Sequence, residues 1–412
     1  MTPRTLSTVL LAVVALTGCG ADGQSSALPP GFVDEKVARV EQPTAIALLP
    51  HGGMLVTTQQ GVVRIVDRRG RLVRRPALDL RKRICTERER GMTGVAVDPE
   101  FAANRRIYLY YTYKKFGGCP TVSAGTPVNR LARFVLARDG TIDPASESVL
   151  VDNVPSYGAT HNGGDVKFDK DGYLYVAIGD GGRDYARRSS RAETNQASRD
   201  RNALLGKVLR LTSNGQPAPG NPFEGPGTVR CARVGVARPG TICREAYAWG
   251  FRNPFRFALD PDTAGVRMAV NDVGQVAWEE VDLVKRGGDH GWPLREGPCQ
   301  RDGRVRCVPP PPSLTDPAFS YARLKGCIAI LAGVFVPKGV WPKRFDGAYL
   351  FADFTCGIRM LSGSLEDSPD VGPFSKAIGA ISMTFRGGDL YYAEFFAGEI
   401  RRIRYVGARR RG

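Results

Sequence analysis

Residues 160–182 read Thr-His-Asn-Gly-Gly-Asp-Val-Lys-Phe-Asp-Lys-Asp-Gly-Tyr-Leu-Tyr-Val-Ala-Ile-Gly-Asp-Gly-Gly. Two short runs of alternating apolar and polar residues flank the sequence Asp-Lys-Asp-Gly, which ends at Gly172. We interpret these four residues as a turn, because glycine readily adopts the positive φ that such a turn needs. The pattern predicts a β-hairpin with a strand over residues 173–178. His161 and Asp180 lie at opposite ends of this hairpin sequence, and reactive side chains on loops between rigid strands often form a pocket.

The same arrangement of short strands recurs six times along the chain. Each copy contains an apolar run, a second short strand after a turn, and a third strand that often begins near Gly or carries Arg. Because no copy can bury both of its faces alone, the repeats predict an all-β fold, a six-bladed β-propeller. A pair of β-sandwiches is the alternative, but it would not readily produce six similar units. The copies span residues 44–66, 94–136, 166–211, 255–284, 333–361 and 381–403.

The N-terminal residues have the features of an export signal. A basic start precedes an apolar run over residues 6–16, which is too short to span a bilayer. Leu-Thr-Gly-Cys, ending at Cys19, resembles a bacterial lipoprotein signal, in which cleavage leaves a lipidated cysteine. An ordinary signal peptide with a chance cysteine is the alternative. We therefore expect a signal peptide (1–18), a lipidated Cys19 with a flexible tether (19–36) and a single propeller (37–412), exported and lipid-anchored to the outer face of the cell membrane.

Eight of the nine cysteines remain after Cys19 is set aside. An even number in an exported chain implies disulfides. Zinc is the alternative, but no Cys-x-x-Cys spacing is present and the histidines lie elsewhere. The segments 214–243 and 298–317, rich in Pro, Gly and Cys, are interpreted as surface insertions closed by disulfides. Pairing of neighbours predicts Cys85–Cys119, Cys231–Cys243, Cys299–Cys307 and Cys327–Cys356.

The formal net charge is +17, and 46 of the 58 basic residues are arginine. Such a balance favours anionic partners, including lipid headgroups, acidic glycans and nucleic acid. No nucleic-acid motif or basic helix is visible, so we expect no nucleic-acid partner and interpret most of the charge as a solvated surface. The C-terminal run of residues 409–411 is interpreted in the same way, with a membrane-surface role as the alternative.

Three polar clusters, over residues 160–162, 249–254 and 271–275, could meet where loops gather around a propeller channel. A neutral His161 can act as a general base near pH 7, and Arg252 can stabilise a developing oxyanion. The backbone carbonyls of Gly274 and Gln275 could ligate calcium, which prefers oxygen donors.

Structural alternatives stand beside each of these interpretations. His161 could bond across blades without reacting, and Pro254 could fix a turn after Arg252. Asp169 and Asp171 resemble the start of a calcium-binding EF-hand loop, but Gly172 follows too early, so we interpret them as turn residues. Neither a Ser-His-Asp spacing nor a His-Glu-x-x-His motif is visible in the sequence. The Gly-rich stretches are not followed by a helix, which argues against nucleotide binding.

Several ordered motifs within residues 42–405 resemble the glucose/sorbosone dehydrogenase family, the soluble PQQ-dependent aldose dehydrogenases. They lie at residues 91–101, 104–108, 161–164, 178–180, 205–210, 221–223, 250–254 and 287–293.

The resemblance implies a six-bladed propeller that holds pyrroloquinoline quinone (PQQ) and calcium at one end of its channel. His161 matches the base that takes a proton from the C1 hydroxyl of the sugar while hydride passes to the quinone. Arg252 matches the arginine that stabilises the reduced quinone, and Asn253 a neighbouring cofactor contact. The calcium ligands would be the carbonyls of Gly274 and Gln275, and Glu89 stands where the family's site has glutamine.

The chain departs from the family pattern where PQQ carboxylates are clamped. A lysine after the fifth blade's inner strand is replaced by Phe-Thr-Cys-Gly (354–357), and an Arg-x-Arg pair by Ile-Gly-Ala-Ile (378–381). Leaving three carboxylates unpaired in a partly desolvated site costs several kcal/mol. Three hypotheses follow: PQQ-dependent oxidation of an aldose to its lactone, a catalytically silent lipoprotein that binds a cell-envelope glycan or a protein, and calcium-dependent hydrolysis like that of propeller lactonases.

Overall fold

The computed structural model describes residues 28–122, 125–188, 194–301, 305–323, 326–367 and 369–407. The predicted signal peptide, the lipidation site Cys19 and the C-terminal arginine run lie outside these residues.

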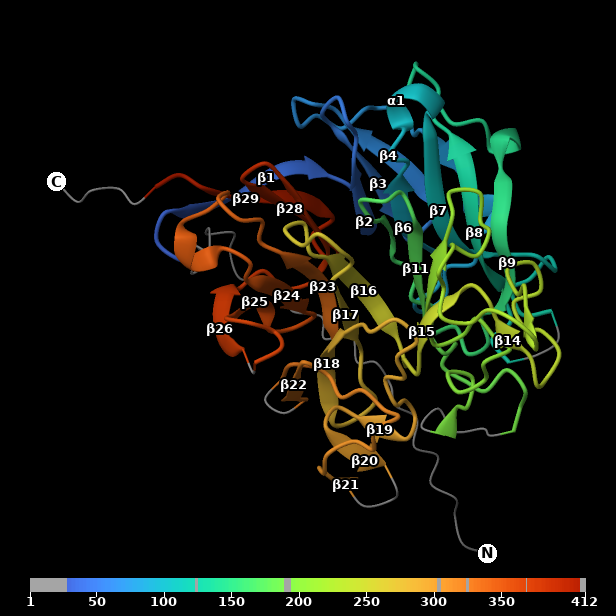
Figure 1. Cartoon of the computed structure of the whole chain (residues 1–412). Helices are drawn as coiled ribbons and strands as arrows, with labels where there is room; N and C mark the ends of the chain where they lie inside the picture. The colour runs from blue at the N-terminus through green and yellow to red at the C-terminus, as the bar shows by residue number, and fades with distance from the viewer. Residues whose placement is uncertain are drawn as a thin grey trace, which may run out of the picture.

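Six four-stranded antiparallel sheets radiate around a central axis in the described part of the chain, which confirms the predicted six-bladed β-propeller (Figure 1). The first three, from inner to outer strand, are β2 (Pro43–Leu48), β3 (Met54–Thr58), β4 (Val62–Val66), β5 (Leu78–Asp79); β6 (Met92–Val97), β7 (Arg106–Tyr113), β8 (Val128–Val135), β9 (Ser148–Pro155); and β10 (Val166–Phe168), β11 (Leu174–Ile178), β12 (Lys207–Leu211), β15 (Ala246–Trp249). The others are β16 (Pro254–Leu259), β17 (Met268–Asp272), β18 (Trp278–Leu283), β22 (Phe319–Ala322); β23 (Ile330–Phe335), β24 (Tyr349–Asp353), β25 (Gly357–Ser362), β26 (Asp370–Ser375); and β27 (Ala380–Arg386), β28 (Asp389–Glu394), β29 (Glu399–Tyr405), β1 (Phe32–Arg39).

The ring is closed by pairing of the first strand with the last. β1 is antiparallel to β29, with Phe32 opposite Tyr405, so the two ends of the chain complete one blade. Strand β1 begins inside the segment predicted to be a tether up to residue 36, so the propeller starts at Phe32. The Phe32 ring makes an edge-on contact with Trp341 at a centroid distance of 4.7 Å, which anchors the strand in an apolar cluster.

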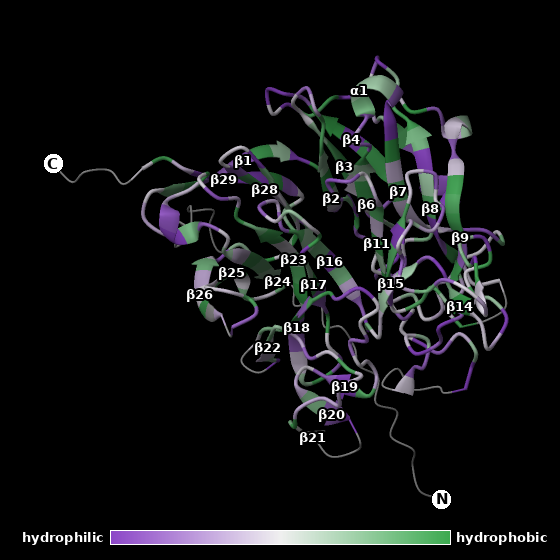
Figure 2. Ribbon diagram, viewed as in Figure 1, coloured by the Kyte–Doolittle hydropathy of each residue, from purple (hydrophilic) through white to green (hydrophobic). Residues whose placement is uncertain are grey.

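The blades are held together by apolar faces that the strand sequences present to one another. Strand β11, Leu-Tyr-Val-Ala-Ile, is buried at every position, as expected for a strand covered on both faces. Apolar segments accordingly follow the strands, while polar segments follow much of the outer loops (Figure 2). The hairpin β10–β11 is confirmed: Asp169 Oδ1 accepts the N–H groups of Asp171 and Tyr173, and Gly172 has a φ of 81°. Asp169 and Asp171 are therefore turn residues.

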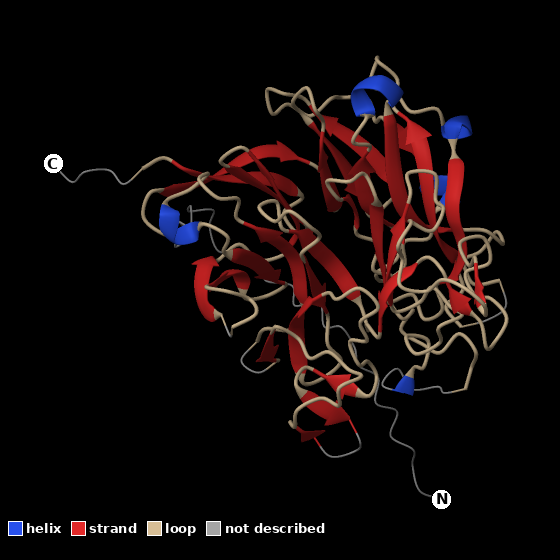
Figure 3. Cartoon of the chain, viewed as in Figure 1, coloured by secondary structure: helices blue, strands red, loops and turns tan. Residues whose placement is uncertain are grey.

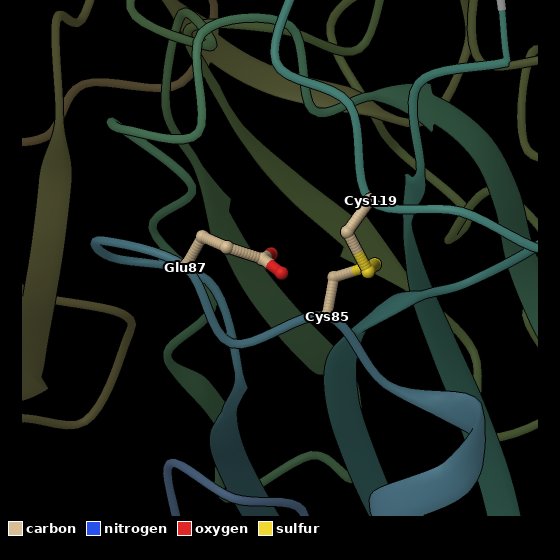
Figure 4. Close-up of side chains that lie close together, drawn as sticks. All are labelled: Cys85, Glu87 and Cys119. Atoms are coloured by element: carbon tan, nitrogen blue, oxygen red, sulfur yellow. A yellow bond between two sulfur atoms is a disulfide. The ribbon is translucent and has the colours of Figure 1, made fainter.

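All four predicted disulfides are present, so these cysteine sulfurs are not free to bind zinc. The bond between Cys85 and Cys119 is seen in Figure 4, with the carboxylate of Glu87 nearby. Two disulfides close the predicted insertions. These insertions carry the short strands β13 (Thr228–Val229), β14 (Ile242–Cys243), β20 (Cys299–Arg301) and β21 (Val305–Arg306), and β19 (Arg295–Glu296), just before the second insertion, pairs with β20.

In the described part of the chain, helix is confined to single turns between strands (Figure 3). The bounds are α1 (Phe101–Asn104), η1 (Arg81–Arg83), η2 (Pro144–Ser146) and η4 (Lys343–Phe345). Among the described residues, no helix has the length and apolar character needed to cross a bilayer.

Candidate active site

A cavity of about 500 Å³ opens at one end of the propeller channel. Residues of the inner strands β2, β16, β23 and β27 form part of its wall, and loops between blades form its rim. The residues predicted for catalysis, cofactor binding and calcium binding line this cavity, although they come from segments up to 186 residues apart, from Glu89 to Gln275. The lining residues that the sequence singled out are Glu89, His161, Arg252, Asn253, Gly274 and Gln275.

His161 is positioned by a buried carboxylate behind it. Its Nδ1 lies 2.7 Å from Oδ1 of Asp180, which is fully buried, and the second oxygen of Asp180 accepts the indole N–H of Trp292 at 2.9 Å. Because an ionised carboxylate only accepts hydrogen bonds, this pairing assigns the ring proton to Nδ1 and leaves Nε2 as an acceptor. His161 therefore has the orientation of a general base.

The backbone around His161 is constrained as tightly as its ring. His161 has a φ of 51°, a region that non-glycine residues adopt only where surrounding contacts hold them. Its N–H donates to Oε2 of Glu89 at 2.7 Å. A Cβ atom on Gly179 would lie 2.2 Å from the carbonyl oxygen of His161, so only glycine permits this close approach.

Arg252 is nearly buried and its guanidinium is fixed from two sides. Nη1 donates to the carbonyl of Val273 at 2.7 Å, and Nε donates to the side-chain oxygen of Gln275 at 2.9 Å, with Nη2 bonding the same oxygen. The backbone N–H of Arg252 donates to Asp272 at 2.8 Å. Burial lowers the pKa of Arg252, opposed by the negative charges of Asp180 and Asp272. Since three of the five N–H donors are used, two remain for a ligand.

Asn253 and Glu89 connect Arg252 to the histidine loop. The amide Nδ2 of Asn253 lies 3.3 Å from Oε2 of Glu89, the oxygen that also accepts from His161. Oδ1 of Asn253 is buried and has no hydrogen-bond partner among the described residues. The charge of Glu89 is not offset by its neighbour Arg90, which donates to the carbonyls of Cys119 and Ser156 instead.

The carbonyls of Gly274 and Gln275, predicted to hold calcium, both accept hydrogen bonds from Arg323. Nη1 of Arg323 lies 2.7 Å from the oxygen of Gly274 and 2.8 Å from that of Gln275. A divalent cation ligated by these two oxygens would lie at or within van der Waals contact of the Arg323 guanidinium. The two groups are both positively charged, so they would repel each other. The residues present therefore do not fit calcium at this position in the structure. No sequence motif marks Arg323; the only signal is an arginine four residues before Cys327.

The two clamp positions are apolar, as the sequence indicated, since Phe354 and Ile381 line the cavity. Phe255 and Phe395 add aromatic surface. Aromatic faces and guanidinium groups, Arg252 among them, are the kinds of group that bind planar anions.

The second histidine of the sequence motifs lies outside the cavity. His290 stacks on Phe251 at a centroid distance of 4.5 Å, and its Nδ1 lies 3.2 Å from Asp282. Of the segment 289–293, Trp292 contributes to the site, through its bond to Asp180.

These features define a six-bladed propeller with a carboxylate-oriented histidine and a buried arginine at one end of its channel. Residues 40–353 match the family model described as Glucose / Sorbosone dehydrogenase, and the chain belongs to that family.

Known relatives agree with this assignment. The HIPL2 protein of Arabidopsis thaliana is 25% identical over 356 residues, covering 74% of this chain and 48% of the relative, so the chain spans about half of that protein. The aldose sugar dehydrogenase YliI of Escherichia coli is 28% identical over 278 residues, covering 66% of this chain and 65% of that protein. The PQQ-bound aldose sugar dehydrogenase of Streptomyces coelicolor shares the fold, with a TM-score of 0.67, 21% identity, and coverage of 92% of this chain and 99% of that one.

Proposed function

We propose that this protein oxidises an aldose sugar to its lactone, with PQQ as the electron acceptor. The observation that carries the proposal is His161, fixed on Asp180 and lining the same cavity as Arg252, in a member of this family. The names of relatives support it, since one is an aldose sugar dehydrogenase and a protein of the same fold binds PQQ.

The residues of the site can carry out the proton chemistry of this reaction. Nε2 of His161 accepts the proton of the C1 hydroxyl, and Asp180 stabilises the imidazolium that forms. PQQ, when bound, supplies the two-electron acceptor for the hydride that leaves C1. Arg252, which is buried and has two N–H donors left, stabilises negative charge that develops beside it. The same residue and Asn253 would hold the cofactor, against the aromatic wall that includes Phe354.

The proposal includes export and a lipid anchor at Cys19 on the outer face of the cell membrane, where the substrate is a small sugar or a cell-envelope glycan. The eight cysteines in disulfides support an oxidising compartment. Metabolic labelling with a radiolabelled fatty acid tests the anchor. The label should be incorporated into the wild-type protein and not into Cys19→Ser.

The activity is tested with purified protein, PQQ binding measured by calorimetry and dye-linked oxidation measured on a panel of aldoses. Binding and turnover are expected in the wild type. His161→Gln should abolish turnover and keep PQQ affinity within about threefold. Because His161 is buried against Asp180, the substitution should also lower the free energy of unfolding by about 1–3 kcal/mol. Absence of both PQQ binding and turnover across the panel would exclude the proposed function.

The apolar side chains of Phe354 and Ile381 at the clamp positions favour a second candidate, a catalytically silent propeller that binds a glycan or a protein. This candidate predicts no response to PQQ and saturable binding to cell-envelope glycans or envelope proteins that is unchanged by His161→Gln. The hydrolase alternative relies on calcium at Gly274 and Gln275, where the hydrogen bonds from Arg323 are unfavourable to it.

A further inference from the structure

One guanidinium nitrogen bridges two successive carbonyls at the wall of the cavity. Nη1 of Arg323 has two N–H groups, and it lies within hydrogen-bonding distance of the oxygens of Gly274 and Gln275, at 2.7 and 2.8 Å. Calcium ligated by the same oxygens would sit 2.3–2.6 Å from each, in the space that this nitrogen occupies. The guanidinium and the metal are therefore mutually exclusive at these two carbonyls.

Arg323 is held in this position by its own surroundings. Its Nε lies 3.1 Å from Oε1 of Glu279, a fully buried carboxylate, and its Nη2 donates to the carbonyl of Ile328. The segment that follows is closed by the disulfide between Cys327 and Cys356. Since contacts on three sides fix the side chain, its place at the carbonyls is built into the fold.

The same segment is tied to the fifth blade at a second point. The buried carboxylate of Asp353 accepts the backbone N–H of Ala329 at 3.2 Å and the hydroxyl of Tyr321 at 2.7 Å. Tyr321 and Ala329 lie on either side of Arg323 in the chain, so both flanks of the arginine are anchored on one residue. A swing of Arg323 away from the carbonyls would require this anchorage to rearrange.

The charge of the cavity points to an anionic ligand. Its lining includes the arginines at positions 88, 90, 252, 256 and 323, and Glu89 is the one carboxylate among the lining residues in the described part of the chain. Arg90 and Arg256 are engaged with backbone carbonyls. Arg252 bonds Val273 and Gln275, and Arg323 bonds Gly274 and Gln275, so these two guanidinium groups lie beside the carbonyls predicted to hold calcium.

We propose that Arg323 serves as a built-in cation in place of calcium, so that this site binds a planar carboxylate anion without a metal. The inference deepens the proposed function and rests on it where the anion is PQQ. A fixed positive charge at the carbonyls provides the electrostatic attraction that a metal ion would provide. Since four of its five N–H donors are used by Gly274, Gln275, Ile328 and Glu279, one N–H of Nη2 remains to donate to a carboxylate oxygen. This explains how the chain can lack the lysine and Arg-x-Arg clamp and still receive an anion.

The first test measures calcium alone, so it does not depend on PQQ. Calcium is titrated by calorimetry into metal-stripped wild type, Arg323→Ala and Arg323→Lys. Removing the guanidinium leaves two carbonyls and the carboxylate of Glu279, an oxygen set that calcium prefers. Arg323→Ala should therefore bind one more calcium ion per chain than the wild type, whereas Arg323→Lys, which keeps the charge, should not. Equal stoichiometry in the wild type and a folded Arg323→Ala would overturn the proposal.

The second test titrates PQQ in EDTA and then in calcium. Wild-type affinity should be the same in both, and Arg323→Ala in EDTA should bind at least about tenfold more weakly, with recovery when calcium is added. The exposed Arg344→Ala serves as a matched control with wild-type affinity. Wild-type affinity that depends on calcium contradicts the proposal. If PQQ binds to no variant in either condition, the proposed function fails, and the calcium stoichiometry still decides the role of Arg323.

Discussion

Nδ1 of His161 lies 2.7 Å from Oδ1 of Asp180, and these two residues flank the same hairpin, β10–β11. The hairpin returns the chain on itself, so residues 19 positions apart meet at the cavity end of the third blade. Asp180 is buried and fixed by Trp292, so the imidazole ring has one orientation. The orientation of the proposed base is therefore set by the hairpin β10–β11 together with Trp292.

Asp180→Asn should remove the preference for the Nδ1–H tautomer of His161. A neutral amide neither fixes the ring proton nor stabilises an imidazolium, so sugar turnover should fall by about 10² to 10⁴. Nitrogen-15 NMR of the histidine ring gives a readout independent of activity, because the Nδ1 and Nε2 signals exchange character when the tautomer changes. Asp169→Asn, at the turn of the same hairpin, is the matched control. Turnover within threefold of wild type in Asp180→Asn would show that Asp180 does not orient the base.

The disulfides should differ in how much they stabilise the fold. Cys85–Cys119 joins residues 34 apart, whereas Cys299–Cys307 joins residues 8 apart. Chain-entropy arguments give losses of about 4 and about 2.5 kcal/mol respectively when each pair is replaced by alanine. Denaturant unfolding of the two double variants, measured under the same conditions, checks the order. A larger loss for the Cys299–Cys307 variant would contradict loop closure as the source of stability.

Much of the fold could be predicted from the sequence because three strands of each blade carry their own local signal. The hairpin before Ile178 shows this, since its alternation and its Gly turn are contained in a few residues. The fourth strand of the first blade carries no such signal, because β5 consists of Leu78 and Asp79 alone and is too short for a periodic pattern. Residues 32–36 of strand β1 fall within the predicted tether because the partner strand, β29, lies at the other end of the chain.

The site shows the same division. His161 and Arg252 were predictable because they belong to ordered motifs, whereas Arg323 depends on tertiary structure. It reaches Gly274 and Gln275 because β22, which pairs with β18 in the fourth blade, ends one residue before it. No local pattern could indicate that contact.

Phe32→Ala tests the closure of the ring by β1. The Phe32 ring contacts Trp341, Phe345 and Phe374 at centroid distances of 4.7, 5.2 and 5.5 Å, and 8% of the residue is exposed. Removing a buried phenyl ring from such a cluster costs about 3–5 kcal/mol. Denaturant unfolding should show this loss.

The matched control for closure is Phe116→Ala, because Phe116 is 60% exposed and should contribute little. A loss below about 1 kcal/mol in Phe32→Ala would mean that β1 is dispensable. That result would agree with the tether interpretation of this segment.

Lys207 makes stability depend on pH through burial. It opens strand β12, only 1% of it is exposed, and its Nζ donates to the carbonyls of Leu205 and Ser198 at 2.8 and 3.2 Å. Burial lowers the pKa of Lys207 from 10.5 to about 7. Two carbonyls solvate the amine, and the described residues place no carboxylate in a salt bridge with it.

The sign of the pH effect follows from the two pKa values. Because the pKa in the folded state lies below that in the unfolded state, Lys207 contributes stability that is complete above about pH 10.5 and is lost as pH falls through about 7. Lys207→Met removes the titration, so the free energy of unfolding of the wild type, relative to this variant, should rise from pH 7 to pH 10, by an amount on the order of a few kcal/mol. Urea unfolding at three pH values in this range measures the difference, with the exposed Lys170→Met as a control for loss of a lysine. The wild type releases a proton from Lys207 on folding in this pH range and Lys207→Met does not, so their free energies of unfolding must diverge as pH changes. A difference in free energy of unfolding that stays constant from pH 7 to pH 10 would therefore mean that burial does not hold the Lys207 amine neutral.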